Sequence, residues 1–350
     1  MAADRKIRVL IVDDSAIVRK MLGEALASEP DLEVVGTAPD PFVARDKILS
    51  LRPDVLTLDV EMPRMDGLTF LKKLMRFHPL PVIVISSLAQ ASSQTALEAL
   101  QCGAVDVLAK PGGPYSVGEL KQDLPQKVRA AAHARVGPAK PQLTAPALAV
   151  PLVLSGASTS TVIAIGASTG GTEAIREVLT AMPANMPPIV IVQHIPPVFS
   201  LAFANRLNDL CKLRVKEAAD GDRLTSGLAL IAPGNFHMTL TKAGGEYRAS
   251  IQDGPRVCYQ RPSVDVLFES VAQVAKSDAI GAILTGMGSD GAQGLLKMKR
   301  AGARTIAQDE ASCVVFGMPR EAIRMGGVDR VLPLNRVAAE LTALSAMAVR

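Results

Sequence analysis

The stretch Val162-Ile-Ala-Ile-Gly-Ala-Ser-Thr-Gly-Gly171 decides how the second half of this 350-residue chain folds. Its apolar run is too short for a membrane span and predicts an interior parallel strand. Residues 173–182 have helix-forming composition, so we expect Ser168 at the turn where the strand becomes a helix. Gly166, Ser168 and Gly170 fit the pattern G-x-S-x-G, in which small neighbours permit a sharp turn that exposes the hydroxyl. Ser168 is therefore a candidate nucleophile.

This turn is also compatible with two roles that involve no nucleophile. The serine could simply cap the helix, or the glycines could form a phosphate-binding turn at the helix N-terminus. A dinucleotide site would place an acidic residue about 20 positions further on, near the end of the next strand. That strand, expected over 188–192, is followed by Gln193 and His194 instead. A nucleotide-binding role is therefore less favoured.

Two further strand ends carry the residues that acyl transfer needs besides a hydroxyl, namely a base and a carboxylate that fixes it. His194 follows one strand, and Asp290 lies in the glycine-rich turn after the strand expected over 279–284. Neighbouring parallel strands lie about 4.8 Å apart, so the three side chains can meet above one sheet. Residues 213–251 predict a more irregular, hairpin-like section. His237 within it is a rival base, ranked second to His194.

The first half alternates strand and helix patterns five times, which predicts a doubly wound parallel sheet. In such a sheet, ligands gather at the carboxyl ends of the strands. Three carboxylates held together repel one another and favour a hard divalent cation, usually Mg²⁺. A cation and an ammonium group around one carboxylate make a site that can accept a phosphoryl group. The polar residues at these strand ends are Asp13, Asp14, Asp59, Ser86 and Lys110.

Composition and the join between the halves set the domain organisation. A segment with three prolines in ten residues begins at Gly137 and breaks both helix and sheet. We expect one domain over residues 1–125, an extension of its last helix to about residue 136 and a linker within 126–158, and a second domain over 159–350.

The same composition excludes several classes of function. No stretch approaches the roughly 20 apolar residues of a membrane helix, and the residues before the first strand show no signal-peptide cleavage pattern. We therefore expect a cytoplasmic protein without direct membrane insertion. Aromatic residues make up only 3% of the chain, tryptophan is absent, and Lys and Arg form no dense cluster, so nucleic acid is not an expected partner. The four cysteines are too far apart for a zinc cluster or a disulfide framework.

The first half resembles the receiver domain of bacterial response regulators. The matching features are Asp13-Asp14, Asp59 followed by Met62-Pro-Arg-Met-Asp-Gly67, Ser86, and Lys110-Pro111. The resemblance implies that Asp59 takes a phosphoryl group from a histidine kinase. It also implies that Asp14, Asp59 and the backbone carbonyl of Glu61 hold Mg²⁺, and that Ser86 turns its hydroxyl toward the phosphate.

The second half is similar to the catalytic domain of chemotaxis protein-glutamate methylesterases over about residues 160–348. The matching motifs are Gly166-Ala-Ser-Thr-Gly-Gly171, Gln193-His-Ile-Pro196 and Thr285-Gly-Met-Gly-Ser-Asp-Gly291. The resemblance implies that Ser168 is the nucleophile, His194 the base and Asp290 the orienting acid, with the Met287 N–H as an oxyanion donor and no cofactor. The expected fold class is α/β, with a flavodoxin-like receiver and a Rossmann-like serine esterase domain that contains a hairpin insertion.

Together the two resemblances imply a phosphorylation-activated enzyme. Its expected substrates are glutamate γ-methyl esters on methyl-accepting chemotaxis receptors, with release of methanol, and also receptor glutamines, which it would deamidate. The expected partners are those receptors and a chemotaxis histidine kinase. We also hypothesise that the unphosphorylated receiver blocks access to Ser168. The alternative is a phosphorylation-dependent docking module without catalysis.

Overall fold

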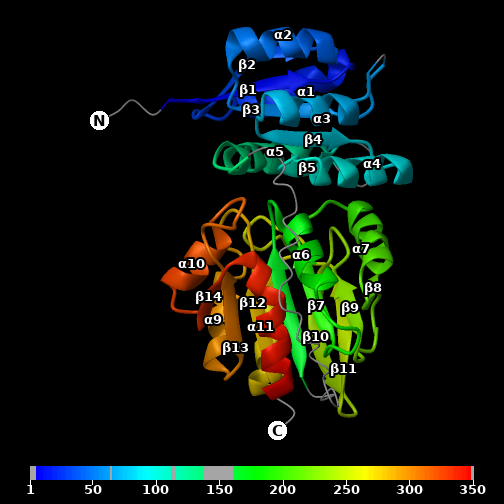
Figure 1. The fold of residues 1–350 in the computed structure, drawn as a ribbon, viewed down its shortest axis with the longest axis vertical. Helices are drawn as coiled ribbons and strands as arrows, with labels where there is room; N and C mark the ends of the chain where they lie inside the picture. Colours follow the sequence, from blue (N-terminus) through cyan, green and yellow to red (C-terminus); the bar gives the residue numbers. More distant parts are fainter. Residues whose placement is uncertain (1–4, 64, 112–115, 137–160, 348–350) are drawn as a thin grey trace. The chain divides into compact units, whose positions relative to one another are not determined.

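The computed structural model describes residues 5–63, 65–111, 116–136 and 161–347. The chain divides into two compact units, Met1–Leu143 and Thr144–Arg350, and each unit is a parallel sheet with helices packed on it (Figure 1). The α/β fold class expected from the sequence is therefore confirmed. The linker predicted within 126–158 falls mostly outside the described residues. Among those residues, no helix is both long enough and apolar enough to cross a membrane.

The first unit is built on a five-stranded parallel sheet with the strand order β2-β1-β3-β4-β5. Its central strands consist mainly of Val, Ile and Leu and are buried, as expected of a sheet covered on both faces. The order of the strands reverses between β1 and β3, which is where ligands bind in open α/β sheets. The elements are β1 (Ile7–Val12), α1 (Ala16–Ala27), β2 (Leu32–Ala38), α2 (Pro41–Leu51), β3 (Val55–Asp59), α3 (Gly67–Phe77), β4 (Val82–Ser86), α4 (Gln90–Gln101), β5 (Asp106–Ala109) and α5 (Val117–Ala132).

The second unit is built on a seven-stranded parallel sheet with the order β14-β13-β12-β6-β7-β9-β8. Helix α9 contacts both α8 and α10, and α6 contacts both α7 and α11. Phe268 on α8 and Phe199 on α7 are among the largest fully buried side chains. The elements are β6 (Val162–Ala167), α6 (Gly171–Thr180), β7 (Ile189–Gln193), α7 (Phe199–Leu210), β8 (Arg214–Glu217), β9 (Leu228–Ile231), β10 (His237–Ala243), β11 (Glu246–Gln252), α8 (Val264–Val274), η1 (Lys276–Asp278), β12 (Ala279–Ile283), α9 (Ala292–Arg300), β13 (Arg304–Gln308), α10 (Met318–Arg324), β14 (Arg330–Leu332) and α11 (Leu334–Met347).

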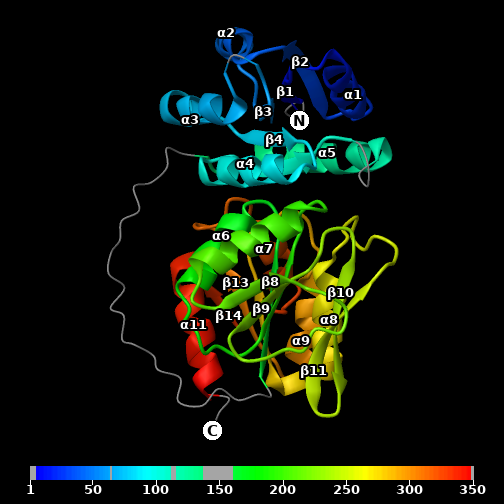
Figure 2. The same ribbon diagram turned by 90° about the vertical axis from the view of Figure 1, so that its right-hand side faces the viewer.

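Two expectations drawn from the sequence were wrong in detail. The section 213–251 is not all hairpin-like, because β8 and β9 pair in parallel and extend the central sheet. Only β10 and β11 form an antiparallel hairpin, which lies beside α8 (Figure 2). The last receiver helix was expected to reach about residue 136, but α5 ends at Ala132. There the His133 ring contacts the Arg129 carbonyl at 2.8 Å, which satisfies an acceptor left open at the helix end.

Candidate active site and phosphorylation site

Ser168 directly follows β6, and α6 begins three residues later. Gly170 has a φ of 77°, a conformation that glycine adopts without strain, and so allows the chain to turn between the two elements. Gly166 precedes the serine by two residues, and no side chain fits there, because a Cβ would lie 2.2 Å from Val264 Cγ1. The Ser168 side chain is only 8% exposed. The glycines of the motif thus serve a sharp turn packed closely against α8.

His194 directly follows β7, which pairs with β6. Its Nε2 lies 2.8 Å from Asp290 Oδ2, and its Nδ1 is buried with no hydrogen-bond partner among the described residues. The described part of the chain also contains no hydrogen bond between Ser168 Oγ and the His194 ring. One ring nitrogen is therefore held by a carboxylate, and the other remains available to accept a proton.

Asp290 lies between β12 and α9, but its carboxylate faces the N-terminus of α8. Oδ2 accepts a hydrogen bond from the Val264 N–H at 2.7 Å, and Oδ1 accepts one from the Asp265 N–H at 3.0 Å and one from the Ser263 hydroxyl at 2.8 Å. Burial opposes ionisation here, but the hydrogen bond from His194 and the backbone N–H groups outweigh it and lower the pKa of Asp290. The carboxylate is held ionised and in a fixed orientation.

Two residues that support this arrangement were given no role from the sequence. Ser263 is the N-cap of α8 and donates to Asp290, and the sequence Pro262-Ser263 before an apolar helix is a recognisable start signal for a helix. Gln193 donates from Nε2 to the carbonyls of Ser168 at 2.9 Å and His194 at 3.2 Å. This glutamine connects the ends of β6 and β7. Its role can be recognised only once the pairing of the two strands is known.

Met287, the residue expected to supply an oxyanion donor, follows Gly286 in the turn after β12. A Cβ at Gly286 would lie 2.7 Å from Ser168 Cβ, so this turn passes directly against the serine. The Met287 N–H has no hydrogen-bond partner among the described residues. An unpaired N–H group beside a serine is the feature that an oxyanion site requires.

His237, which the sequence offered as a further candidate, and Arg261 both form structural contacts near the start of α8. His237, the rival base, is the first residue of β10, and its ring contacts the Pro255 carbonyl at 2.9 Å and accepts from the Ser263 N–H at 3.2 Å. With both ring nitrogens bonded to the backbone, His237 supports the start of α8. Arg261, in the loop before α8, donates to Asn235 and Asp253.

In the first unit, the structure brings the predicted polar residues together at the switch point of the sheet. The Lys110 ammonium lies 2.7 Å from Asp59 and 3.4 Å from Asp13. Asp59 and Asp13 are fully buried, and carboxylate oxygens of Asp13, Asp14 and Asp59 all lie within 4.8 Å of one another. Burial raises the pKa of Asp59 to about 6 and also raises the pKa of Asp13.

These residues fit a divalent cation. The cluster holds three carboxylates and one lysine, and Asp13 Oδ2 is buried with no hydrogen bond among the described residues, its ionic partner being the Lys110 ammonium at 3.4 Å. The three carboxylates therefore carry more negative charge than the lysine neutralises, and such a set of oxygen ligands suits Mg²⁺.

Ser86 ends β4 and is fully buried. Its hydroxyl donates to the Ser92 carbonyl in the first turn of α4 at 3.1 Å, so in this structure it bonds to α4. The Ser92 hydroxyl in turn donates to the carboxylate of Glu61 in the loop after β3. Ser87 adds a longer hydrogen bond of 3.4 Å to the same carboxylate. The role expected for Glu61 involved only its backbone carbonyl, but its side chain also connects the loop after β3 to the start of α4.

Comparison with known proteins places both units. Residues 163–341 match the family model described as CheB methylesterase, and residues 9–121 match the response regulator receiver domain. A protein-glutamate methylesterase/protein-glutamine glutaminase of Syntrophus aciditrophicus is 57% identical over 337 residues, covering 96% of this chain and 98% of that protein. A protein of the same name from Salmonella choleraesuis is 56% identical over 342 residues, covering 97% of each chain. The crystal structure of the Thermotoga maritima CheB methylesterase catalytic domain covers 53% of this chain and 98% of that one, with 40% identity and a TM-score of 0.52.

Proposed function

The chain belongs to the CheB methylesterase family and carries a response regulator receiver domain, and from this we propose that it is a phosphorylation-activated protein-glutamate methylesterase that acts on methyl-accepting chemotaxis receptors. Its relatives are named for the methylesterase and glutaminase activities together. We propose that this chain likewise deamidates receptor glutamines, because an ester and a primary amide at the same γ-carbon undergo the same acyl transfer. We also place the reaction in the cytoplasm.

The observation that carries this proposal is the state of the His194 ring. Nε2 is bonded to a buried, ionised carboxylate, while Nδ1 has no hydrogen-bond partner among the described residues. His194 follows β7, the strand that pairs with the strand before Ser168. A carboxylate that fixes the tautomer of a histidine and stabilises its charged form makes the other nitrogen a general base. A residue retained only for packing or docking does not need this arrangement.

The reaction follows from these roles. His194 Nδ1 takes the Ser168 proton as Oγ attacks the γ-carbonyl carbon of the substrate, and the Met287 N–H stabilises the oxyanion that forms. The bond to the methoxy oxygen then breaks, and the protonated His194 gives its proton to that oxygen, so methanol leaves. Water repeats the sequence on the acyl-serine and releases the glutamate side chain. For a glutamine substrate, ammonia leaves in place of methanol. One oxyanion donor is worth about 3 to 4 kcal/mol of transition-state stabilisation.

We propose that Asp59 is the phosphoacceptor and that a chemotaxis histidine kinase is the donor. Asp14, Asp59 and the Glu61 carbonyl would hold Mg²⁺, which neutralises charge on the phosphoryl group. Lys110 already lies 2.7 Å from Asp59 and is placed to contact the phosphoryl oxygens. Ser86 exchanges its bond to Ser92 for one to the phosphate, which connects the phosphorylation site to the start of α4.

The test is methanol release from methylated receptor membranes by the full chain, with and without a small phosphodonor. We expect release from the wild type, a rise with phosphodonor, and loss of release in a Ser168→Ala variant. A Ser226→Ala variant is the matched control, because Ser226 lies before β9 at the amino end of that strand, away from the strand ends that carry the site. An Asp59→Asn variant should keep basal release and lose the stimulation. Release that persists in Ser168→Ala would contradict the catalytic assignment, and a well-folded wild type that binds receptors without release would favour docking alone.

A further inference from the structure

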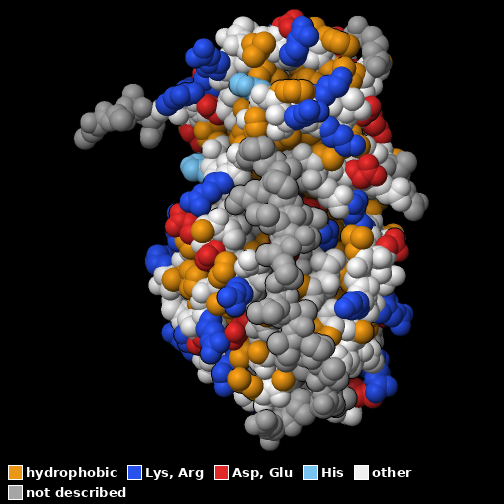
Figure 3. Space-filling view, in the orientation of Figure 1, with side chains coloured by type: hydrophobic (Ala, Val, Ile, Leu, Met, Phe, Trp, Pro, Cys, Tyr) orange, Lys and Arg blue, Asp and Glu red, His pale blue; other side chains and the backbone are white. Residues whose placement is uncertain are grey.

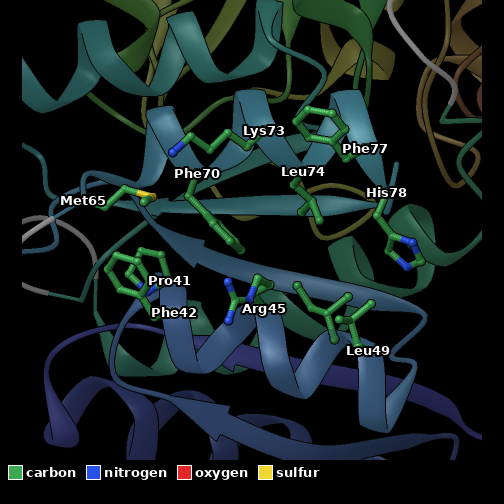
Figure 4. A pocket seen from close by; sticks show the side chains of 11 residues that line it. Pro41, Phe42, Arg45, Leu49, Met65, Phe70, Lys73, Leu74, Phe77 and His78 are labelled. Carbon is green, nitrogen blue, oxygen red and sulfur yellow. The ribbon is translucent and has the colours of Figure 1, made fainter.

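A groove of about 310 Å³ opens between α2 and α3 of the first unit, and its described lining residues include none of Asp13, Asp14, Asp59, Ser86 and Lys110. Phe70 and Leu74 on α3 point across it toward α2, which contributes Phe42 and Leu49, and Phe77 lies at the end of α3 (Figure 4). The groove has no part in the esterase or in the phosphorylation chemistry described above.

The walls of the groove expose large apolar side chains. Phe42 is 46% exposed, Leu49 62% and Phe77 74%. The whole chain has eight phenylalanines, and three of them line this groove. An apolar patch of this kind on a folded protein is typical of an interaction site, because covering it removes about 25 cal/mol per Å² of unfavourable apolar exposure.

The charges around the groove indicate what covers it. Arg45, Lys73 and His78 line it, and none of its described lining residues is an Asp or a Glu. Arg76 adds a further guanidinium, which stacks over the exposed Phe77 ring with its Cζ 5.1 Å from the ring centroid. Arg45 is paired with Asp46, but Lys73 forms no ion pair within the described residues. Figure 3 shows hydrophobic side chains interspersed with Lys and Arg on the visible face of this unit. The occupant must therefore be apolar on one side and acidic at its edges.

The walls also indicate the backbone conformation of the occupant. Both walls are helices of 11 residues, each about 16 Å long at 1.5 Å per residue. Their backbone groups bond within the helices, so an extended peptide would find no strand edge to pair with. A helix satisfies its own backbone and presents apolar residues on one face at i, i+3 or i+4, and i+7.

We propose that the α2–α3 groove of the receiver binds an acidic amphipathic helix of a partner protein. Its apolar stripe packs among Phe42, Leu49 and Phe77, and its carboxylates face Lys73 and Arg76. Met65, in the loop that leads from Asp59 to α3, also lines the groove. The partner therefore binds next to the segment that follows the phosphoacceptor, without covering the strand ends themselves.

The test is a selection of random peptides of about 16 residues, long enough for four turns of helix, on the immobilised full chain. Peptides that also bind a Phe77→Ser variant are removed in a counter-selection. We expect the remaining sequences to be acidic and to repeat apolar residues with helical spacing. A synthesised binder should become helical on binding by circular dichroism. Lys73→Glu should weaken its affinity about tenfold, and so should an increase in salt from about 50 to about 500 mM.

Two control variants carry the same kinds of change outside the groove. Ile17→Ser replaces an exposed apolar residue of α1, and Lys20→Glu reverses an exposed charge on the same helix. Both should bind the selected peptide as the wild type does, and thermal unfolding shows whether each variant is folded. Selected peptides that are neutral or basic, or a failure to obtain any that distinguish Phe77→Ser from the wild type, would overturn the proposal. If the full chain self-associates in sedimentation and Phe77→Ser does not, the groove binds a second copy of the chain, and the proposal of a partner helix is wrong.

Discussion

Asp290 and Asp265 cap each other's helices: Asp290, before α9, caps the start of α8, and Asp265, in α8, caps the start of α9. Asp290 precedes α9, yet its carboxylate accepts the N–H groups of Val264 and Asp265 at the start of α8. Asp265 lies in the first turn of α8, yet its Oδ1 accepts the Gly294 N–H in the first turn of α9 at 2.6 Å. Each anion interacts favourably with the positive end of a helix. The two helices are thereby fixed to each other at the point where the candidate triad needs its carboxylate.

The Asp265 carboxyl is buried in this position, which makes its ionised form unfavourable. Burial raises its pKa from 3.8 to about 6, and the nearby charge of Asp290 acts in the same direction. A carboxyl whose pKa is higher in the folded state loses its proton first in the unfolded state. Its contribution to stability therefore falls as the pH rises from about 4 to about 6, and the penalty stays in place above that range.

The first prediction is that Asp265→Asn gains stability relative to the wild type as the pH is raised. The amide oxygen still accepts the Gly294 N–H, and no charge has to be buried. Between pH 4 and 7 the difference in unfolding free energy should move in favour of the variant by roughly 2 to 3 kcal/mol. Urea unfolding of both proteins at the two pH values measures it. Parallel pH dependence of wild type and variant would show that Asp265 does not titrate as described. Asp265→Ala, which also loses the cap, should be destabilised at both pH values.

The second prediction concerns the tautomer of His194. Asp290→Asn keeps a side chain of the same shape but no longer stabilises a charged imidazole, and its amide group can donate to Nε2 and reverse the tautomer. We expect kcat for methanol release to fall by about 10³ to 10⁴, as in other triads that lose the carboxylate. Substrate affinity should change much less. The measurement is steady-state release from methylated receptor membranes, and a loss of less than tenfold would mean that another group orients the ring.

The third prediction uses the close packing of Gly166 on α8. In Gly166→Ala, the new Cβ would lie 2.2 Å from Val264 Cγ1. Val264 must then move, and its N–H is one of the donors to Asp290. We expect kcat to fall by at least about tenfold, since displacement of a catalytic group by a fraction of an ångström is costly.

A double variant separates this clash from a general loss of stability. Val264→Ala removes a fully buried side chain and should cost about 2 kcal/mol of unfolding free energy. In Gly166→Ala/Val264→Ala the two closest contacts of the new methyl group are removed and Phe268 Cζ at 3.2 Å remains, so the activity should recover part of the loss seen in Gly166→Ala. The two changes should thus be strongly non-additive. Additive losses in kcat would mean that the glycine matters for another reason, such as the shape of the turn.

The positions of the strand-end residues could be predicted from the sequence because parallel strands bring their carboxyl ends to one edge. That rule was sufficient to place Ser168, His194 and Asp290 in the segments that follow the neighbouring strands β6, β7 and β12. It was also sufficient for the cluster around Asp59 in the first unit. Short apolar strands can be recognised from their composition, and the polar residues that follow each strand can then be read directly from the sequence.

The residues that hold these groups in place could not be predicted in the same way. Asp265 and Ser263 act on Asp290 across 25 and 27 positions of sequence, and the contact depends on how α8 packs against α9. The parallel pairing of β8 and β9 was missed for a related reason. The sequences of β8 and β9 are compatible with parallel or antiparallel pairing, and the direction depends on how the neighbouring elements connect the two strands. Local pattern therefore predicted where the candidate catalytic and phosphorylation-site residues lie, and tertiary packing decided which residues support them.

The last prediction concerns the link between Glu61 and the start of α4. The Glu61 carboxylate accepts hydrogen bonds from the hydroxyls of Ser92 and Ser87, and the N-cap position of α4, Ala89, offers no side-chain cap. Glu61→Ala removes this link and leaves the backbone carbonyl that we assign to Mg²⁺. Ser86 is then freer to leave the Ser92 carbonyl and turn toward the phosphate.

We therefore expect Glu61→Ala to reach half-maximal stimulation of methanol release at about two- to fivefold lower phosphodonor, which corresponds to roughly 0.5 to 1 kcal/mol less stabilisation of the unphosphorylated state. Ser86→Ala should have the opposite effect, because it removes the hydroxyl that bonds to the phosphate. Glu24→Ala on α1 is the matched control, as it removes an exposed carboxylate that only faces Lys20. A Glu61→Ala variant that needs as much phosphodonor as the wild type, or more, would show that the link does not hold Ser86 away from Asp59. The side chain of Glu61 would then matter only for the local structure of its loop.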